Sequence, residues 1–122
     1  MHPFPHRYAV SAMAAPASVV TLRSAELEDI QSSAPPEFGG PAGNWSPETL
    51  FVAAIADCYI LSFRAVANAS KLEWSEIDCD AVGVLEKTAQ GLWFTVIELQ
   101  AHLRIPAGGD VARAERLLEK AE

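Results

Sequence analysis

Residues 39–63 read "GGPAGNWSPETLFVAAIADCYILSF", and this stretch decides the fold because it contains the strongest helix start in the chain. Ser46 is a good N-cap residue, Pro47 follows at the first helical position, and Glu48 lies in the first turn, where the helix dipole favours an acid. No Gly or Pro interrupts the residues that follow. The stretch therefore predicts one long helix to about Ser70, apolar on most sides, as a helix at the centre of an assembly would be.

The segments before this helix alternate polar and apolar residues, as strands do. "RYAVSAM" (7–13), "ASVVTL" (17–22) and the more polar "AELEDIQ" (25–31) predict three short strands. The run "SSAPPEFGGPAGN" then predicts a loop, since it consists almost entirely of residues that break regular structure.

The segments after the helix predict two long strands and a second helix. "SEIDCDAVGVLE" (75–86) and "LWFTVIELQAHLRI" (92–105) alternate over their whole lengths, and "KTAQG" joins them as a hairpin loop. Asp110 can cap the final helix, whose predicted apolar stripe is Val111, Ala114, Leu117, Leu118 and Ala121. The predicted fold class is therefore α+β, with an antiparallel sheet packed on a long central helix.

Length and composition predict one domain, residues 1–122, that pairs with a second copy. Half of the 122 residues are hydrophobic, so a core is available. However, a chain of this length buries only a moderate fraction of its surface, and the long helix is too apolar for the cover that one chain provides. We therefore expect a homodimer.

The charge of the chain excludes two classes of partner. The formal net charge is −7 and the nine Lys and Arg residues form no basic run, which argues against nucleic acid and against an anionic membrane. Asp57 and Arg64 interrupt the longest apolar run, so no membrane span is expected. The N-terminus lacks the pattern of a secretory signal, and two cysteines make no disulfide framework, so we expect a cytoplasmic protein with reduced thiols.

Cys58, in the middle of the predicted long helix, is the first candidate for chemistry. Free cysteine is among the most buried residue types, so one interpretation is a small core residue. The other is a thiolate nucleophile, which needs a cationic or hydrogen-bonding neighbour, and Asp57 cannot serve as one. The residues around it in sequence would form an apolar substrate pocket, for which the candidates are Leu50, Phe51, Ile55 and Leu61.

The other candidate residues show no catalytic arrangement of their own within one chain. Ten residues of helix, about 15 Å of rise, separate Glu48 from Cys58, so a joint role requires Glu48 of a second chain. Cys79 lies on the apolar face of its strand and is expected to be structural; a disulfide with Cys58 would need that strand directly over the helix. The dispersed cysteines and histidines show no zinc-ligand spacing, and His102 is expected to be solvated, so no metal is predicted.

The stretch "PPEFGGPAGNWSPETLFVAAIADCYILSF" resembles the OsmC/Ohr family of osmotically induced and organic-hydroperoxide-resistance proteins. The family pattern is a Gly-rich loop, a Ser-Pro-Glu or Asn-Pro-Glu start with a Leu, and a cysteine ten residues after the glutamate. Ser46, Pro47, Glu48, Leu50 and Cys58 fill these places. The resemblance implies an intertwined homodimer with its active sites where the subunits meet, and it implies no cofactor.

The activity that the resemblance implies is thiol-dependent reduction of organic hydroperoxides, with Cys58 becoming a sulfenic acid. A second cysteine then forms a disulfide, and a dithiol such as dihydrolipoamide regenerates the enzyme. The family's resolving cysteine falls a few residues after a stripe like "RLLEKAE", whereas this sequence stops at Glu122, so we expect either truncation or a member without that thiol. The family's activating arginine falls in a region that reads "AAPASVVTL" here, flanked by Arg7 and Arg23.

Three hypotheses follow from these observations: a thiol peroxidase, a binding protein that holds a small apolar ligand between subunits without turnover, and a cysteine-dependent hydrolase. An arginine in register and a second cysteine would favour the first, and their absence would favour the second. A histidine beside Cys58 would favour the third.

Overall fold

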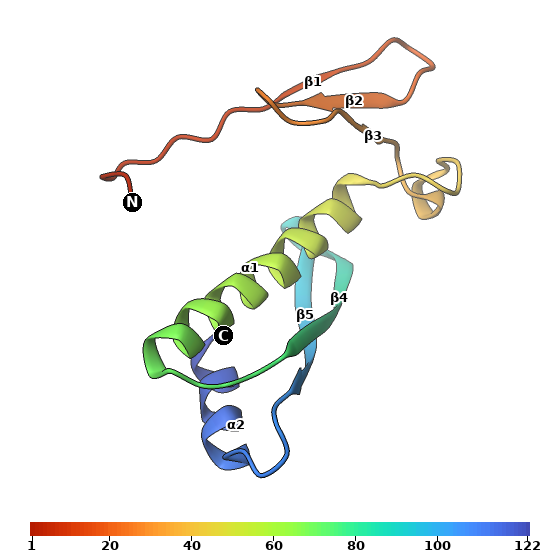
Figure 1. Ribbon diagram of the computed structural model, residues 1–122. Coiled ribbons are helices and arrows are strands. Elements are labelled where there is room, and N and C mark those ends of the chain that lie inside the picture. Colours follow the sequence, from red (N-terminus) through yellow and green to blue (C-terminus); the bar gives the residue numbers. More distant parts are fainter. The chain divides into compact units, whose positions relative to one another are not determined.

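The computed structural model describes all residues 1–122 and confirms an α+β fold with antiparallel sheets and one long helix (Figure 1). The elements in chain order are β1 (Ser11–Met13), β2 (Val20–Arg23), β3 (Ile30–Ser32), a 3-10 helix η1 (Pro36–Phe38), α1 (Pro47–Ser70), β4 (Glu76–Thr88), β5 (Gly91–Arg104) and α2 (Val111–Lys120). The chain divides into two compact units, Met1–Leu50 and Phe51–Glu122, and each is described by itself.

The unit Met1–Leu50 contains a three-stranded antiparallel sheet in the order β1-β2-β3. Leu22 in the central strand lies opposite Ala12 on one side and Ile30 on the other. These strands are shorter than the alternation predicts, because only three residues of β1 and three of β3 find a paired backbone. An ion pair of 3.1 Å between Arg23 and Asp29 links the ends of β2 and β3.

The start of α1 is fixed by a reciprocal cap, as the sequence predicts. The Ser46 hydroxyl oxygen accepts a hydrogen bond of 3.1 Å from the Thr49 backbone N–H, and the Thr49 hydroxyl oxygen accepts one of 2.9 Å from the Ser46 N–H. Thr49 thus takes the place that Glu or Gln has in a capping box. Because Ser46 is buried, this cap defines where the helix begins.

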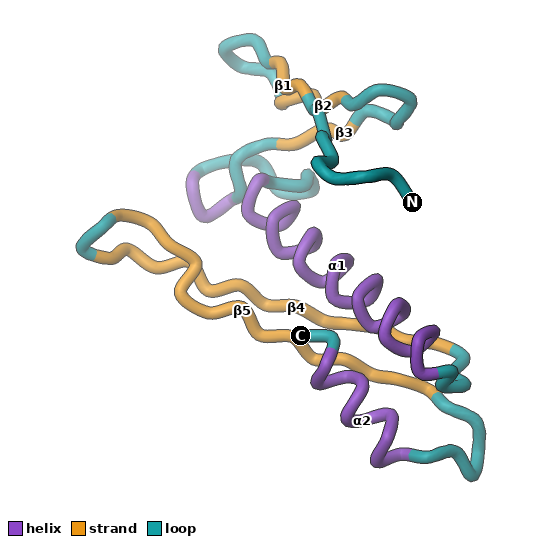
Figure 2. Tube along the Cα trace, turned by 90° about the vertical axis from the view of Figure 1, so that its left-hand side faces the viewer, coloured by secondary structure: helices purple, strands orange, loops and turns teal.

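The unit Phe51–Glu122 is built on the β4–β5 hairpin, and Figure 2 shows α1 running along it. The strands pair from Glu76 opposite Arg104 to Thr88 opposite Gly91, so the turn is tighter than the predicted loop. Gly91 has a φ of +113°, a conformation that other residues rarely adopt. The register shifts at Val84, a bulge that increases the local twist of the ribbon.

One face of the hairpin carries the core. Residues of β4 and β5 alternate between half-buried and exposed positions, as their sequences predict. Both helices contribute to the same core, which packs against Ile77, Cys79, Leu99, Ala101 and Leu103 of the hairpin. The buried residues are Tyr59, Phe63 and Ala67 of α1, Leu117 of α2, and Ala121 just after α2.

Gly83 lies at a tight contact between α1 and the hairpin. A Cβ atom at this position would lie 2.7 Å from Cγ2 of Val52 and 2.9 Å from the ring of Phe94. Atoms at such distances would have to move, so this part of β4 has no room for a side chain. The alternation pattern places Gly83 on the inner face, and the packing explains why the residue is a glycine.

Helix α2 begins at the predicted cap, where the Asp110 carboxylate accepts a 3.0 Å hydrogen bond from the Arg113 N–H. The Arg113 guanidinium also donates to the backbone oxygen of Ser70, at the negative end of α1. The predicted apolar stripe is confirmed at Ala114, Leu117 and Ala121, which are buried, and at Leu118, which packs against the core, but Val111 is exposed. Val111 is the first residue of the helix and lies beyond the reach of the core.

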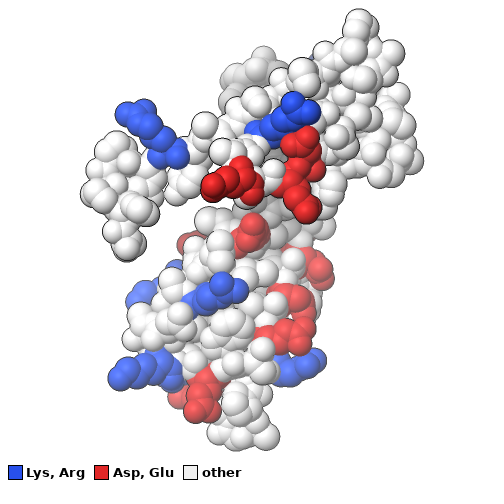
Figure 3. All heavy atoms as spheres, turned by 45° about the horizontal axis from the view of Figure 1, so that its top comes forward, with Lys and Arg blue, Asp and Glu red and all other residues white.

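Helix α1 remains largely uncovered by its own unit. Phe51 and Leu61 are about half exposed, at 49% and 50%. By length and composition α1 is sufficient to cross a membrane, so Asp57 and Arg64 do not exclude a span as the sequence analysis supposed. Central helices of soluble proteins meet the same test. On the face shown in Figure 3, basic side chains are scattered among acidic ones in both units, without a basic patch.

Candidate functional site

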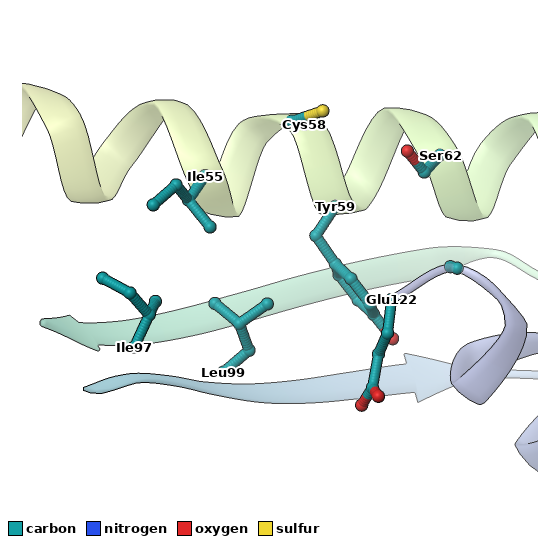
Figure 4. Close-up of a pocket in the computed structure, with 8 residues that line it drawn as sticks. Ile55, Cys58, Tyr59, Ser62, Ile97, Leu99 and Glu122 are labelled. Carbon is teal, nitrogen blue, oxygen red and sulfur yellow. The ribbon is translucent and has the colours of Figure 1, made fainter. Parts of the chain in front are cut away.

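The Cys58 thiol is exposed and lies at a cavity of about 530 Å³ within the unit Phe51–Glu122 (Figure 4). The interpretation of this residue as a buried core side chain is therefore wrong for the folded chain. Helix α1, strand β5 and the residues after α2 line the cavity, which is open to solvent. Its lining residues are Ile55, Cys58, Tyr59, Ser62, Ile97, Leu99, Ala121 and Glu122.

Helical spacing explains which residues of α1 reach the cavity. Ile55, Tyr59 and Ser62 follow one another at intervals of four and three residues, so they form one stripe on the helix. Cys58 lies at the edge of this stripe, between the buried face and the exposed face of α1. The thiol is thus reachable both from the cavity and from solvent, and no disulfide joins it to Cys79.

The wall of the cavity is mostly apolar, with Ile55 on α1 facing Ile97 and Leu99 on β5 (Figure 4). Tyr59 crosses from α1 towards the C-terminal residues, and its hydroxyl donates a 2.8 Å hydrogen bond to the backbone oxygen of Leu118. Burial raises the pKa of Tyr59, and the nearby Glu122 raises it further. The phenol is therefore neutral at physiological pH, and the cavity suits an apolar ligand with one polar group.

Glu48, Leu50, Phe51 and Leu61, the other predicted site residues, are not among the residues that line this cavity. Leu50 and Glu48 belong to the unit Met1–Leu50, and neither lines the cavity. Phe51 stacks on Phe94 with ring centroids 5.0 Å apart, and Leu61 lies on the exposed face of α1. Of the four predicted substrate-binding residues, only Ile55 lines the cavity.

Glu48 has an unusual environment in the first turn of α1. Its Oε1 atom is shielded from solvent and has no hydrogen-bond partner in the chain. A carboxylate oxygen without a donor is costly to bury, so a donor from outside the chain would stabilise it.

Sequence reasoning missed the polar residues of the cavity. Ser62 follows Cys58 by four residues, and this spacing alone indicates that the two share a helix face. Glu122, Ile97 and Leu99 carry no such local signal, because long-range packing brings β5 and the end of the chain to α1. No histidine lines the cavity, so the histidine that would favour the cysteine-hydrolase hypothesis is not found at this site.

Cys79 lies half-buried on the inner face of β4 and packs against the core. Burial raises the pKa of its thiol, and the neighbouring Asp80 and Asp78 carboxylates raise it further. Both effects keep the thiol protonated and unreactive. This environment supports the structural role that the sequence predicts for Cys79.

The Cys79→Ala variant is expected to lose about 1 kcal/mol of stability, as small core truncations do. Its reactivity with peroxide should equal that of the wild type. Folding raises the pKa of Cys79, so the protonated thiol stabilises the folded state at neutral pH. This stabilisation is lost as the pH rises through the pKa of Cys79 in the folded protein. The stability difference between the two proteins should therefore shrink at alkaline pH. Urea unfolding at neutral and alkaline pH tests this, and loss of peroxide reactivity in the variant would identify Cys79 as the reactive thiol.

Strand pairing creates a polar group on the outer face of the hairpin that spacing along the chain did not indicate. His102 Nδ1 lies 2.8 Å from Asp78 Oδ1, and Asp80 offers a further carboxylate within 4.8 Å. All three side chains are exposed, and exposed acidic groups of this kind are common without a metal ion. The group is separate from the Cys58 cavity, whose lining includes none of the three.

Residues 40–122 match the family of OsmC-like proteins. The organic hydroperoxide resistance protein of Xanthomonas axonopodis pv. citri (strain 306) is 36% identical over 96 residues, which cover 76% of this chain and 64% of that protein. The uncharacterised protein YmaD of Bacillus subtilis (strain 168) is 28% identical over 93 residues, covering 74% of this chain and 62% of YmaD. The matches thus span less than two thirds of the length of these relatives.

A solved structure extends the likeness to nearly the whole fold. The organic hydroperoxide resistance protein OsmC of Legionella pneumophila aligns with a TM-score of 0.79 and 26% identity, covering 98% of this chain and 84% of that one. The sequence match starts just before α1 and continues through β4, β5 and α2, so it includes all the residues that line the cavity.

Proposed function

We propose, from the premise that the chain belongs to the family of OsmC-like proteins, that it reduces organic hydroperoxides to alcohols through the thiol of Cys58. The observation that carries the proposal is an accessible thiol at an apolar cavity. The sequence relative from Xanthomonas and the solved structure from Legionella, both described as organic hydroperoxide resistance proteins, support it.

The reaction requires only that the thiolate sulfur lie in line with the O–O bond of the hydroperoxide. The Cys58 sulfur attacks the terminal oxygen of the hydroperoxide, so that an S–O bond forms and the O–O bond breaks. The sulfur loses two electrons and becomes a sulfenic acid, while the leaving alkoxide takes a proton from water and departs as the alcohol. A dithiol reductant of the dihydrolipoamide type returns the sulfenic acid to the thiol. These steps, in the cytoplasm, complete the proposed cycle.

The cavity predicts the substrate class. An alkyl or aryl group binds against the side chains of Ile55, Ile97 and Leu99. Each methylene that the cavity buries adds about 0.8 kcal/mol of binding free energy, so a few methylenes raise the preference for the organic substrate by one or two orders of magnitude. Cumene hydroperoxide should therefore oxidise Cys58 at least about tenfold faster than hydrogen peroxide does. Sulfenic-acid trapping over a time course measures both rates. If neither peroxide oxidises Cys58 faster than a free thiol, the peroxidase proposal fails.

A homodimer is part of this proposal, with Glu48 of one subunit serving the site of the other. The half-exposed apolar residues of α1 and the unpartnered Glu48 oxygen both support a second copy. The interface should belong to the obligate class, which buries more than about 2,000 Å². Sedimentation at micromolar concentration should give a dimer, and a single monomeric species would contradict this expectation.

A second candidate function is the binding of a small apolar ligand without turnover. The observation that favours it is the absence of a cation among the cavity residues, since a thiolate forms more readily beside one. In that case an apolar probe such as cumyl alcohol should bind the cavity, while cumene hydroperoxide leaves Cys58 unoxidised. The same trapping experiment separates the two functions.

A further inference from the structure

The Cys58 cavity contains few groups that can stabilise negative charge. Glu122 lines the cavity with a carboxylate, whose oxygens accept hydrogen bonds when ionised and therefore do not stabilise an anion. Tyr59 has a neutral phenol, but it already donates its proton to Leu118. Arg64 is the only cation in α1 and is not among the lining residues.

Ser62 is the remaining donor. Its side chain is half-buried and lines the cavity one turn after Cys58. Serine in a helix often donates to the backbone oxygen four residues earlier, but Ser62 does not. The side-chain hydrogen bonds of α1 and its cap involve Ser46, Thr49 and Tyr59, and Ser62 forms none. Its hydroxyl is therefore an uncommitted donor at an apolar wall.

The direction of the two side chains places this donor opposite the sulfur. Cβ atoms four residues apart on a helix lie about 5–6 Å from one another, and helical side chains lean towards the N-terminus. In Figure 4 the oxygen of Ser62 points towards Cys58, and the sulfur of Cys58 points towards Ser62. The two atoms form no hydrogen bond with each other, so the hydroxyl is free to donate to a substrate oxygen.

We propose that the Ser62 hydroxyl is a catalytic donor that stabilises the leaving alkoxide when Cys58 attacks a hydroperoxide, an inference that rests on the proposed function. As the O–O bond breaks, negative charge moves to the oxygen that carries the organic group. A donor aimed at this oxygen stabilises the charge that develops there, and the apolar side chains around it strengthen the interaction. The proton that completes the alcohol comes from water and is relayed through the Ser62 hydroxyl, which ends the step unchanged.

This role predicts a specific pattern in the Ser62→Ala variant. The second-order rate constant for oxidation of Cys58 by cumene hydroperoxide should fall about 100-fold, as it does when a comparable donor is removed elsewhere. The rate of Cys58 alkylation by iodoacetamide, and its dependence on pH, should stay unchanged because Ser62 acts on the leaving oxygen. Ser62→Thr should retain most of the oxidation rate, since it keeps a hydroxyl.

Peracetic acid provides a sharper test. Its leaving group is acetate, which needs little stabilisation, so Ser62→Ala should slow its reaction less than tenfold. Ser70→Ala, in the last turn of the same helix and outside the cavity, is the matched control and should react at the wild-type rate with both oxidants. Sulfenic-acid trapping follows each reaction under identical conditions.

Several outcomes would overturn the proposal. Equal oxidation rates for the wild type and Ser62→Ala would show that Ser62 has no part in the reaction. Equal losses with both oxidants, or in both Ser62 variants, would indicate a packing role, and an altered pH profile of alkylation would mean that Ser62 acts on the thiolate. A wild-type protein that reacts no faster than a free thiol defeats the proposed function itself, and this control separates the two failures.

Discussion

The Cys58→Ser variant is expected to lose hydroperoxide reduction by about 1,000-fold or more, since a serine hydroxyl cannot form the sulfenic acid on which turnover depends. Its free energy of unfolding should stay within about 0.5 kcal/mol of the wild-type value, because the side chain is exposed. Consumption of cumene hydroperoxide in the presence of a dithiol measures the first quantity, and urea unfolding measures the second.

The matched control is Cys79→Ser, which removes the only other thiol. It should keep the activity and lose stability, since its side chain is half-buried. If Cys58→Ser kept measurable turnover while Cys79→Ser lost it, the assignment of the reactive thiol would be reversed. If both variants lost hydroperoxide reduction, the two thiols would have to act together.

The Phe63→Ala variant is expected to lose about 3–5 kcal/mol of stability, the largest structural effect in this chain. Phe63 is 0% exposed, and its ring meets the edge of Trp74 with centroids 5.6 Å apart and planes at 76°. Truncation removes the buried ring and the aromatic contact and leaves a cavity where α1, α2 and the hairpin meet. Since small domains are stable by about 5–15 kcal/mol, this loss is a large share of the total.

Urea unfolding followed by circular dichroism measures this loss. Phe51→Ala is the control, since Phe51 lies on the same helix but is 49% exposed. Its loss should be smaller, because it removes only part of the contact with Phe94. Equal losses in the two variants would mean that Phe63 is not the centre of the core.

Much of the fold follows from local sequence signals. Ser46 and Pro47 predict the start of α1, and the structure confirms it through the bond between Ser46 and Thr49. The alternation in β4 and β5 predicts which side chains face inward, because strand geometry repeats every two residues. These signals act within a few residues, so they can be recognised without knowledge of the partner segments.

The lengths of the N-terminal strands and the lining of the cavity could not be predicted in this way. The strand expected over 7–13 pairs only at Ser11–Met13, since a strand exists only where a second backbone lies beside it. Closeness in sequence to Cys58 suggested Leu61 as a substrate contact. A helix turns by about 100° at each residue, so Leu61 lies on another face and Ser62 reaches the cavity.

The close approach at Gly83 has a consequence for interpreting mutational scans of this protein. A scan of all substitutions should show intolerance at Gly83 as well as at Cys58, and a map of sensitive positions alone would place both in one active site. The two differ in cause, since Gly83 is limited by the 2.7 Å from a Cβ atom to Val52, and Cys58 by chemistry. Smaller residues at both positions 52 and 94 should restore alanine at Gly83, since the Phe94 ring also lies 2.9 Å from that Cβ atom, whereas no neighbouring change should replace the sulfur.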